Sequence, residues 1–264
     1  MDPLRRRWYL LPSPLLGPAS WLGAAKALED LGHATLIGDP AMTSTSDIDH
    51  LSPWLADLLR PEVPNDGLGV VIVGHSAACP RIPYLADRLL AHGWNIDSII
   101  CVDGRFPDGR SFTVSEPTYG PMLDGMVRPD DYLPPWPRWW GSLIEGLVVD
   151  PAARDLVFSE ARPVPRSWFD QQCPAPELPA NIGRGFLSFG PGYLESCKRA
   201  ADAGWLTYRL DGDHLHQVVA PEAVAATLSA MASCMATGGS QQDLRVDPDP
   251  PSGPNPDLGP YSGA

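Results

Sequence analysis

Short apolar runs alternate with amphipathic segments along most of this chain. The run from Gly69 to Val73 has no polar alternation, which is typical of a strand buried on both faces at the centre of a parallel sheet. Further strands are predicted at residues 7–11, 34–38, 96–102, 185–189 and 205–210. Helical patterns are predicted at residues 21–32, 48–59, 77–92, 193–203 and 221–236. Strands separated by helices of this length indicate an α/β fold, with a mostly parallel sheet and helices on both of its faces.

Proline divides the chain into segments, because its 31 copies crowd into the middle and into the C-terminal end. We expect the proline-rich segment 107–180 to be a helical insertion, a lid over the carboxyl edge of the sheet. Residues 1–106 and 181–236 then form the core domain. The last segment, 237–264, is acidic and has almost no apolar residues. It cannot bury enough surface to offset its ordering entropy, so it is predicted to be a disordered tail.

Composition excludes several classes of function. The 32 acidic residues exceed the 19 basic ones and give a net charge of −13, whereas binding a nucleic acid requires a basic face. No apolar run reaches the roughly 18 residues of a membrane span. The five cysteines form no C-x-x-C pair, so neither a disulfide framework nor a zinc site is indicated. The sequence therefore predicts a cytoplasmic protein without a metal, a cofactor, or a nucleic-acid or membrane partner.

A nucleophilic serine is predicted where the buried strand runs into Gly74-His75-Ser76-Ala77-Ala78 and then into a helix. This context of strand, tight turn and helix is that of a nucleophile elbow, with Ser76 at the tip. Small residues flank such a serine because the turn brings the strand and helix backbones close together. The amide of Ala77 would lie at a helix N-terminus, where free N–H groups favour an oxyanion.

The general base is expected late in the chain. His214 follows the last predicted strand and precedes the last predicted helix, which places it at the same edge of the sheet as Ser76. His216 lies two residues further on and should point elsewhere. A carboxylate must orient the imidazole, and Asp103, at the end of the strand 96–102, is favoured for this role. Glu195, beyond the strand that ends at residue 189, remains open as the alternative.

The order of serine, acid and histidine on a parallel sheet resembles the α/β-hydrolase family over residues 7–236. The motifs that carry the resemblance are Gly74-His75-Ser76-Ala77-Ala78, Asp213-His-Leu-His-x4-Pro-Glu and Gly17-Pro-Ala-Ser-Trp21. More narrowly, Ser13-Pro-Leu-Leu-Gly-Pro, Val102-Asp-Gly-Arg-Phe-Pro107 and Leu133-Pro-Pro-Trp136 resemble small actinobacterial α/β-hydrolases, some of them associated with natural-product pathways. The resemblance implies a second oxyanion donor from the loop after the first strand. Pro14 has no N–H to give there, so the Leu15 amide is the candidate.

Four tryptophans of the predicted lid suggest a stiff aromatic cover over a roomy apolar pocket. The residues assigned to substrate binding are His75, Trp136, Trp139, Trp140 and Trp168. Cys79, about one helical turn past Ser76, is predicted to be a buried core thiol.

The sequence therefore predicts a serine hydrolase that acts on an ester or thioester with a bulky apolar acyl group, free or carrier-bound. Release of the acyl group by water or by a hydroxyl of the substrate, which would form a lactone, stays open. The first alternative is a non-hydrolytic cyclase or lyase of a natural-product pathway that uses the same pocket. The second is a non-catalytic ligand-binding protein.

Overall fold

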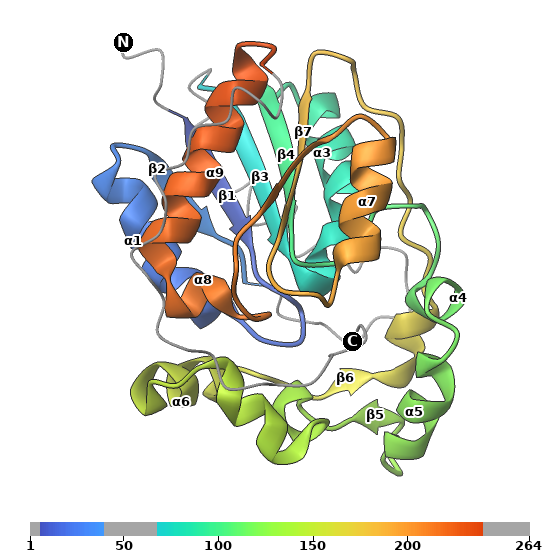
Figure 1. Cartoon of the computed structure of the whole chain (residues 1–264). Coiled ribbons are helices and arrows are strands. Elements are labelled where there is room, and N and C mark those ends of the chain that lie inside the picture. Colours follow the sequence, from blue (N-terminus) through green and yellow to red (C-terminus); the bar gives the residue numbers. More distant parts are fainter. Residues whose placement is uncertain (1–5, 40–67, 240–264) are drawn as a thin grey trace.

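The computed structural model describes residues 6–39 and 68–239. A six-stranded parallel sheet runs through it in the order β2-β1-β3-β4-β7-β8 (Figure 1). The strands are β1 (Arg7–Leu11), β2 (Ala34–Ile37), β3 (Val70–His75), β4 (Ile96–Val102), β7 (Gly183–Ser188) and β8 (Leu206–Arg209). After β2 the chain returns to the other side of β1 to form β3, so the strand order reverses between β1 and β3. Ligands of open α/β sheets bind at the carboxyl ends of the strands at such a reversal.

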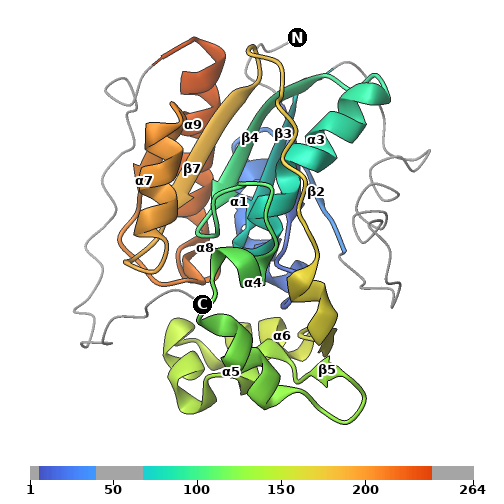
Figure 2. The ribbon, with the colours of Figure 1, turned by 90° about the vertical axis from the view of Figure 1, so that its right-hand side faces the viewer.

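Helices cover both faces of the sheet, as predicted (Figures 1 and 2). On one face, α3 (Ile82–Ala91) and α7 (Leu194–Asp202) contribute to a core that includes Tyr9, Ile72 and Phe186. On the other face, α1 (Leu22–Asp30) and α9 (Pro221–Ala236) pack over Trp8, Val71 and Leu187. All six residues of β3 are buried, which explains its unbroken apolar pattern.

Two predicted helices differ in their first turns. The helix expected over 77–92 begins as a 3₁₀ turn over Ser76–Arg81 and continues as α3. Pro80 lies inside this turn and has no N–H to donate, so a regular α-helix cannot run through it. The helix expected over 21–32 likewise opens with a 3₁₀ turn, at Pro18–Trp21. The helix predicted at 48–59 lies outside the described residues, as does nearly all of the predicted tail. None of the described helices combines the length and apolarity that a bilayer span requires.

The chain between β4 and β7 forms a separate layer beyond the carboxyl ends of the strands (Figures 1 and 2). Its elements are α4 (Phe112–Ser115), α5 (Tyr119–Met126), β5 (Tyr132–Leu133), α6 (Pro151–Ser159) and β6 (Val164–Pro165), with 3₁₀ turns at Trp136–Arg138, Gly141–Leu147 and Arg166–Asp170. We keep the name lid for residues 107–180. The antiparallel pair β5–β6 was not predicted, because a strand of two residues has no detectable period.

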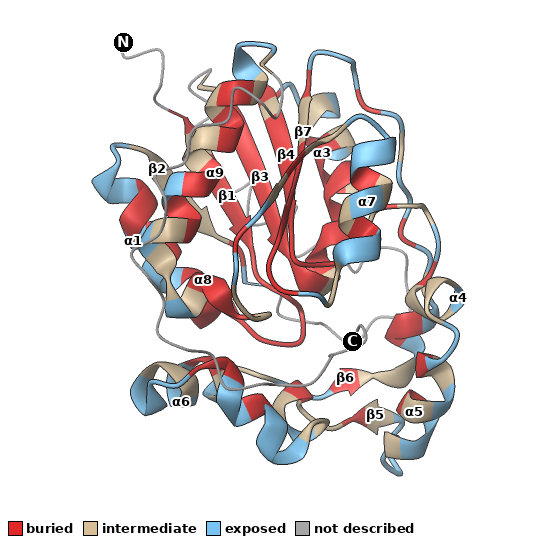
Figure 3. Ribbon diagram, in the orientation of Figure 1, coloured by how far each residue is buried: buried red, intermediate tan, exposed pale blue. Residues whose placement is uncertain are grey.

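The lid is packed onto the core. Its apolar cluster includes Leu15, Leu16 and Ala19 from the loop after β1, and Leu215 from the segment before α8 (His216–Val219). Exposed residues lie mainly on the outer surfaces of the lid and of the helices, while the sheet is buried throughout its centre (Figure 3). The space between the lid and the carboxyl ends of the strands is therefore enclosed by side chains from both layers.

Candidate active site

Ser76 stands in a strained turn at the end of β3. Its backbone has φ 55°, in the left-handed region that residues other than glycine seldom adopt. The turn also brings backbones into close contact. A Cβ on Gly104 would lie 2.3 Å from the carbonyl oxygen of Ser76, and one on Gly74 would lie 2.7 Å from Ile82 Cδ1. Such a turn is a nucleophile elbow, and it holds the hydroxyl at the edge of the sheet.

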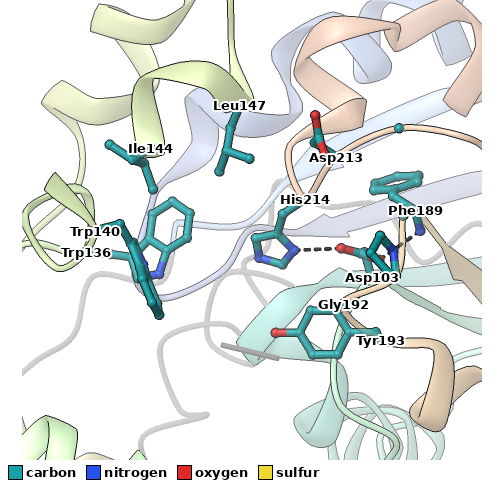
Figure 4. Close-up of a pocket in the computed structure, with 13 residues that line it drawn as sticks. Asp103, Trp136, Trp140, Ile144, Leu147, Phe189, Gly192, Tyr193, Asp213 and His214 are labelled. Carbon is teal, nitrogen blue, oxygen red and sulfur yellow. Dashed lines mark hydrogen bonds and ion pairs between the residues drawn. The ribbon is translucent and has the colours of Figure 1, made fainter. Parts of the chain in front are cut away.

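Three side chains from separate parts of the chain form one hydrogen-bonded line. His214 Nε2 lies 3.0 Å from Ser76 Oγ, and His214 Nδ1 lies 2.7 Å from Asp103 Oδ2. The pair of His214 and Asp103 is drawn in Figure 4. An ionised carboxylate can only accept a hydrogen bond, so Nδ1 carries the ring hydrogen and Nε2 is free to accept the serine proton. This is the geometry that activates a serine for attack.

Asp103 is fixed at the end of β4 by its burial and by a hydrogen bond in addition to the one with His214. Its side chain is buried, and Oδ1 accepts the backbone N–H of Phe189 at 2.8 Å (Figure 4). Its backbone has φ 39°, a second strained position at the same edge of the sheet. Glu195 instead lies in the first turn of α7 with an exposed side chain. Of the two acids left open by the sequence, the structure places Asp103 against His214.

His75 does not lie where the sequence analysis assigned it. Its side chain is 0% exposed, and its Nε2 lies 2.8 Å from the carbonyl oxygen of His214. Its ring lies 4.7 Å from that of His214 and meets Trp21 edge-on. Side chains alternate between the two faces of a strand, so the side chain of His75 points away from the cavities although its neighbour Ser76 lines one of them. The direction in which His75 points cannot be read from its position beside the serine. Burial and the nearby His214 lower the pKa of His75 well below its usual value, so it stays neutral and supports the His214 backbone.

No family model and no curated protein matches this sequence, but solved structures do. An extracellular α/β-hydrolase from a Paenibacillus species matches with a TM-score of 0.61 and 16% identity, over 83% of this chain and 96% of its own. A variant of tomato methylketone synthase I complexed with β-ketoheptanoate matches at 0.65 and 15%, over 88% and 98%. A pyrethroid hydrolase from Sphingobium faniae matches at 0.63 and 17%, over 87% and 98%. This chain has the α/β-hydrolase fold.

The two predicted oxyanion donors of this α/β-hydrolase fold differ in how available their N–H groups are to a substrate. Ala77 follows Ser76 in the 3₁₀ turn, and both residues line one cavity. The Leu15 amide, in the loop after β1, donates to the Ser13 hydroxyl at 3.3 Å. Pro14 beside it has no N–H. The Leu15 amide therefore becomes available to a substrate only if its long bond to Ser13 is given up.

Two narrow cavities meet at the site. The first, of about 60 Å³, is lined by His214, Asp103 and apolar residues that include Trp140, Ile144 and Leu147 (Figure 4). The second, of about 30 Å³, is lined by Ser76, Ala77 and Leu15 together with aromatic side chains of the lid. Trp136 and Tyr193 line both cavities and form the wall between them. We refer to them as the histidine cavity and the serine cavity.

The four predicted tryptophans all line one of these cavities. Trp140 lines the histidine cavity, Trp139 and Trp168 line the serine cavity, and Trp136 lines both. The expected roomy pocket, however, is wrong for this conformation, because both volumes are far below the ~300–1,000 Å³ typical of sites for drug-sized ligands. The aromatic side chains fill the space that they were expected to surround, and a bulky ligand requires the lid to shift.

Tyr193 is a site residue that the sequence analysis missed. It follows β7, its ring lies 5.5 Å from that of His214, and it lines the serine cavity together with Ser76. Burial, and then the charge of Asp103, raise the pKa of the phenol well above its usual value, so it remains a neutral donor. Its position in the loop after β7, at the same edge of the sheet as Ser76, is a signal that the sequence carries. The sequence analysis examined this loop only for an acidic residue.

Two further predictions concern side chains near the serine. Cys79 is a buried thiol, as predicted, and its Sγ donates to the carbonyl oxygen of Gly74 at 3.1 Å. His216 lies at the start of α8 with its ring 5.4 Å from Phe189, and it lines neither cavity. The described residues contain no group of three or more histidine, cysteine or acidic side chains placed to hold a metal ion.

Proposed function

We propose that this protein is a serine hydrolase that cleaves an ester or thioester of an apolar acyl group through an acyl-enzyme. The observation that carries the proposal is the continuous line from Ser76 Oγ through His214 to Asp103, with separations of 3.0 and 2.7 Å. Two solved proteins of this fold, at 16% and 17% identity, are named a polyneuridine aldehyde esterase and a pyrethroid hydrolase, which agrees with ester cleavage.

In the proposed reaction, Ser76 Oγ attacks the carbonyl carbon while His214 Nε2 accepts the serine proton. Asp103 stabilises the imidazolium that results. The tetrahedral intermediate collapses when His214 gives its proton to the leaving alcohol or thiol, and the acyl group stays on Ser76. Water, deprotonated by His214, then releases the acid. If a hydroxyl of the acyl chain reacts in place of water, the product is a lactone.

The two cavities support a division of the substrate. The serine cavity holds the nucleophile and the Ala77 amide, so it suits the acyl group. The histidine cavity holds the residue that protonates the leaving group, so it suits the alcohol or thiol. Apolar linings in both favour an apolar ester, and a bulky or carrier-bound one would enter with displacement of the tryptophan wall.

We further propose that Tyr193 supplies the hydrogen bond that Pro14 cannot. The phenol is protonated and lines the serine cavity with Ser76, so it can donate to the negative charge that develops on the substrate carbonyl oxygen during attack. Replacing Tyr193 by phenylalanine should lower kcat by about 10²-fold, with little change in KM, because one donor to the transition state is lost. Steady-state kinetics on an aryl ester measure this, with Tyr208→Phe as the control. A tenfold rise in KM at constant kcat would contradict the proposal.

The acyl-enzyme itself is tested by active-site labelling. A fluorophosphonate should add to Ser76 of the wild-type protein, as seen by intact mass and peptide mapping. Labelling should fail in His214→Ala, which removes the base, and persist in His92→Ala, which removes an exposed histidine. A folded wild-type protein that takes no label, and forms no adduct with a panel of aryl esters and acyl thioesters, would overturn the proposed function.

A non-hydrolytic lyase is the competing function, because one solved protein of this fold is named a methylketone synthase and was seen with β-ketoheptanoate. Such a reaction would use the same cavities without a covalent intermediate. It predicts turnover of a suitable substrate by a variant that lacks the Ser76 hydroxyl, whereas the acyl-enzyme mechanism predicts almost none.

A further inference from the structure

A buried arginine lines the serine cavity and takes no part in the reaction described above. Arg81 closes the 3₁₀ turn that Ser76 begins, and its side chain is almost fully buried, at 4% exposed. Its Nη1 donates to the carbonyl oxygen of Ala77 at 2.7 Å, which ties the guanidinium to the residue whose amide is the candidate oxyanion donor. Its flat face lies over the Trp168 ring, 3.9 Å from the centroid.

The charge of Arg81 has no acidic partner among the described residues. No carboxylate there comes within ion-pair distance of it, and Nε is buried without a hydrogen-bond partner. Burial, and also the charge of Arg105, lower the pKa of Arg81, with Cys173 acting in the opposite direction. The cation–π contact with Trp168 and the single bond to Ala77 compensate only part of the desolvation of a guanidinium.

Arg105, the other buried arginine of the serine cavity, is in a different situation. It donates to the carbonyl oxygens of Ser111 and Arg110 at 2.8 and 2.9 Å, and Asp108 lies 4.0 Å away. Burial raises the pKa of half-buried Glu116, and the positive charge of Arg105 acts to lower it. Arg105 is thus held by lid and loop atoms, and the uncompensated charge in the cavity is that of Arg81.

We propose that the otherwise apolar acyl group carries a carboxylate, or a similar small anion, at its far end, and that Arg81 binds this anion in the serine cavity. This inference rests on the proposed function, because it assigns the acyl group to that cavity. Nε of Arg81 has no hydrogen-bond partner among the described residues, and an Arg edge matches the two oxygens of a carboxylate. The aromatic walls would contact the chain that links this anion to the scissile carbonyl.

A bound anion would both compensate the buried charge of Arg81 and fix the substrate relative to Ala77. A buried charge without a counter-charge costs free energy in the empty protein, and an anionic ligand removes that cost only when it binds. The same guanidinium holds the Ala77 carbonyl, so a ligand seated on Arg81 would be fixed relative to the oxyanion donor. Arg81 would thus position the scissile carbonyl and select anionic acyl groups over neutral ones.

The test compares matched esters that differ only in charge. Monophenyl adipate, pimelate and suberate would be assayed beside their terminal amides, which have nearly the same shape. Wild-type protein should favour the best carboxylate over its amide by about 30-fold or more in kcat/KM. Arg81→Met should remove that preference, and Arg81→Lys should keep part of it. Arg138→Met, at an exposed lid arginine, should leave it unchanged.

Comparing the two esters separates anion binding from a structural role of Arg81. Loss of the bond to Ala77 should slow both esters to the same extent, whereas loss of the anion site slows only the carboxylate. If Arg81→Met lowers both rates equally, or if wild-type protein hydrolyses acid and amide equally well, the anion site is wrong and the hydrolase proposal survives.

A binding measurement tests the same site without turnover. 4-Phenylbutyrate should raise the melting temperature of the wild-type protein more than 4-phenylbutyramide does, and Arg81→Met should abolish the difference. This result is expected even if no ester is cleaved, in which case the hydrolase proposal alone fails. Equal shifts with the acid and the amide would overturn the anion site whatever the outcome of the activity assays.

Discussion

Replacing Ser76 by alanine should lower kcat for an ester substrate by on the order of 10⁶-fold. The substitution removes the hydroxyl that lies 3.0 Å from His214 Nε2, while the strained turn and both cavities remain. What activity is left should come from water placed by the oxyanion donors. The measurement is steady-state hydrolysis of the best aryl ester, with substrate binding followed separately by calorimetry.

Ser142→Ala is the matched control for this experiment, because Ser142 is exposed on the lid. It should retain the wild-type rate. The melting temperature of Ser76→Ala should be equal to or above the wild-type value, because the substitution removes no hydrogen bond that the fold requires. Retention of more than a small percentage of activity would exclude the acyl-enzyme and favour the lyase alternative.

Replacing Asp103 by asparagine should lower kcat by about 10⁴-fold with little loss of stability. The amide NH₂ of asparagine can donate to His214 Nδ1, which forces the ring hydrogen onto Nε2 and prevents that atom from accepting the proton of Ser76. The amide oxygen can still accept the Phe189 N–H, so the end of β4 should keep its conformation.

Glu195→Gln provides the comparison for the acid, because it makes the same chemical change at the other carboxylate that the sequence left open. It should have wild-type kinetics, since Glu195 lies exposed on α7. If instead Glu195→Gln lost activity and Asp103→Asn retained it, the orientation of His214 by Asp103 would be wrong. Fluorophosphonate labelling rates should rank the two variants in the same order as kcat.

The core of the fold could be predicted from the sequence because its periodicity is local. The predicted bounds of β1, β4 and α9 agree with the structure, and Ser76 and His214 meet as their chain positions indicated. A buried strand followed by an elbow, and a histidine between the last strand and the last helix, are patterns that depend on neighbouring residues alone.

The rest of the site depends on packing between distant segments. His75 meets Trp21 edge-on, Tyr193 lies beside His214 from the loop after β7, and Arg81 stacks on Trp168 of the lid. None of these contacts has a spacing that a sequence reader could detect. The narrow cavities have the same origin, because whether tryptophans line a space or fill it depends on how the lid packs.

Asp103 directly follows β4, and the lid, residues 107–180, lies between it and β7 in the chain. Ser76, Asp103 and His214 therefore all belong to the sheet layer, and the lid is one continuous segment between two neighbouring strands. A different lid segment could be inserted after Phe106 without changing any of these three residues. Recombination at this position would exchange the tryptophans that line both cavities, while Arg81 and the proton-transfer groups stayed in place.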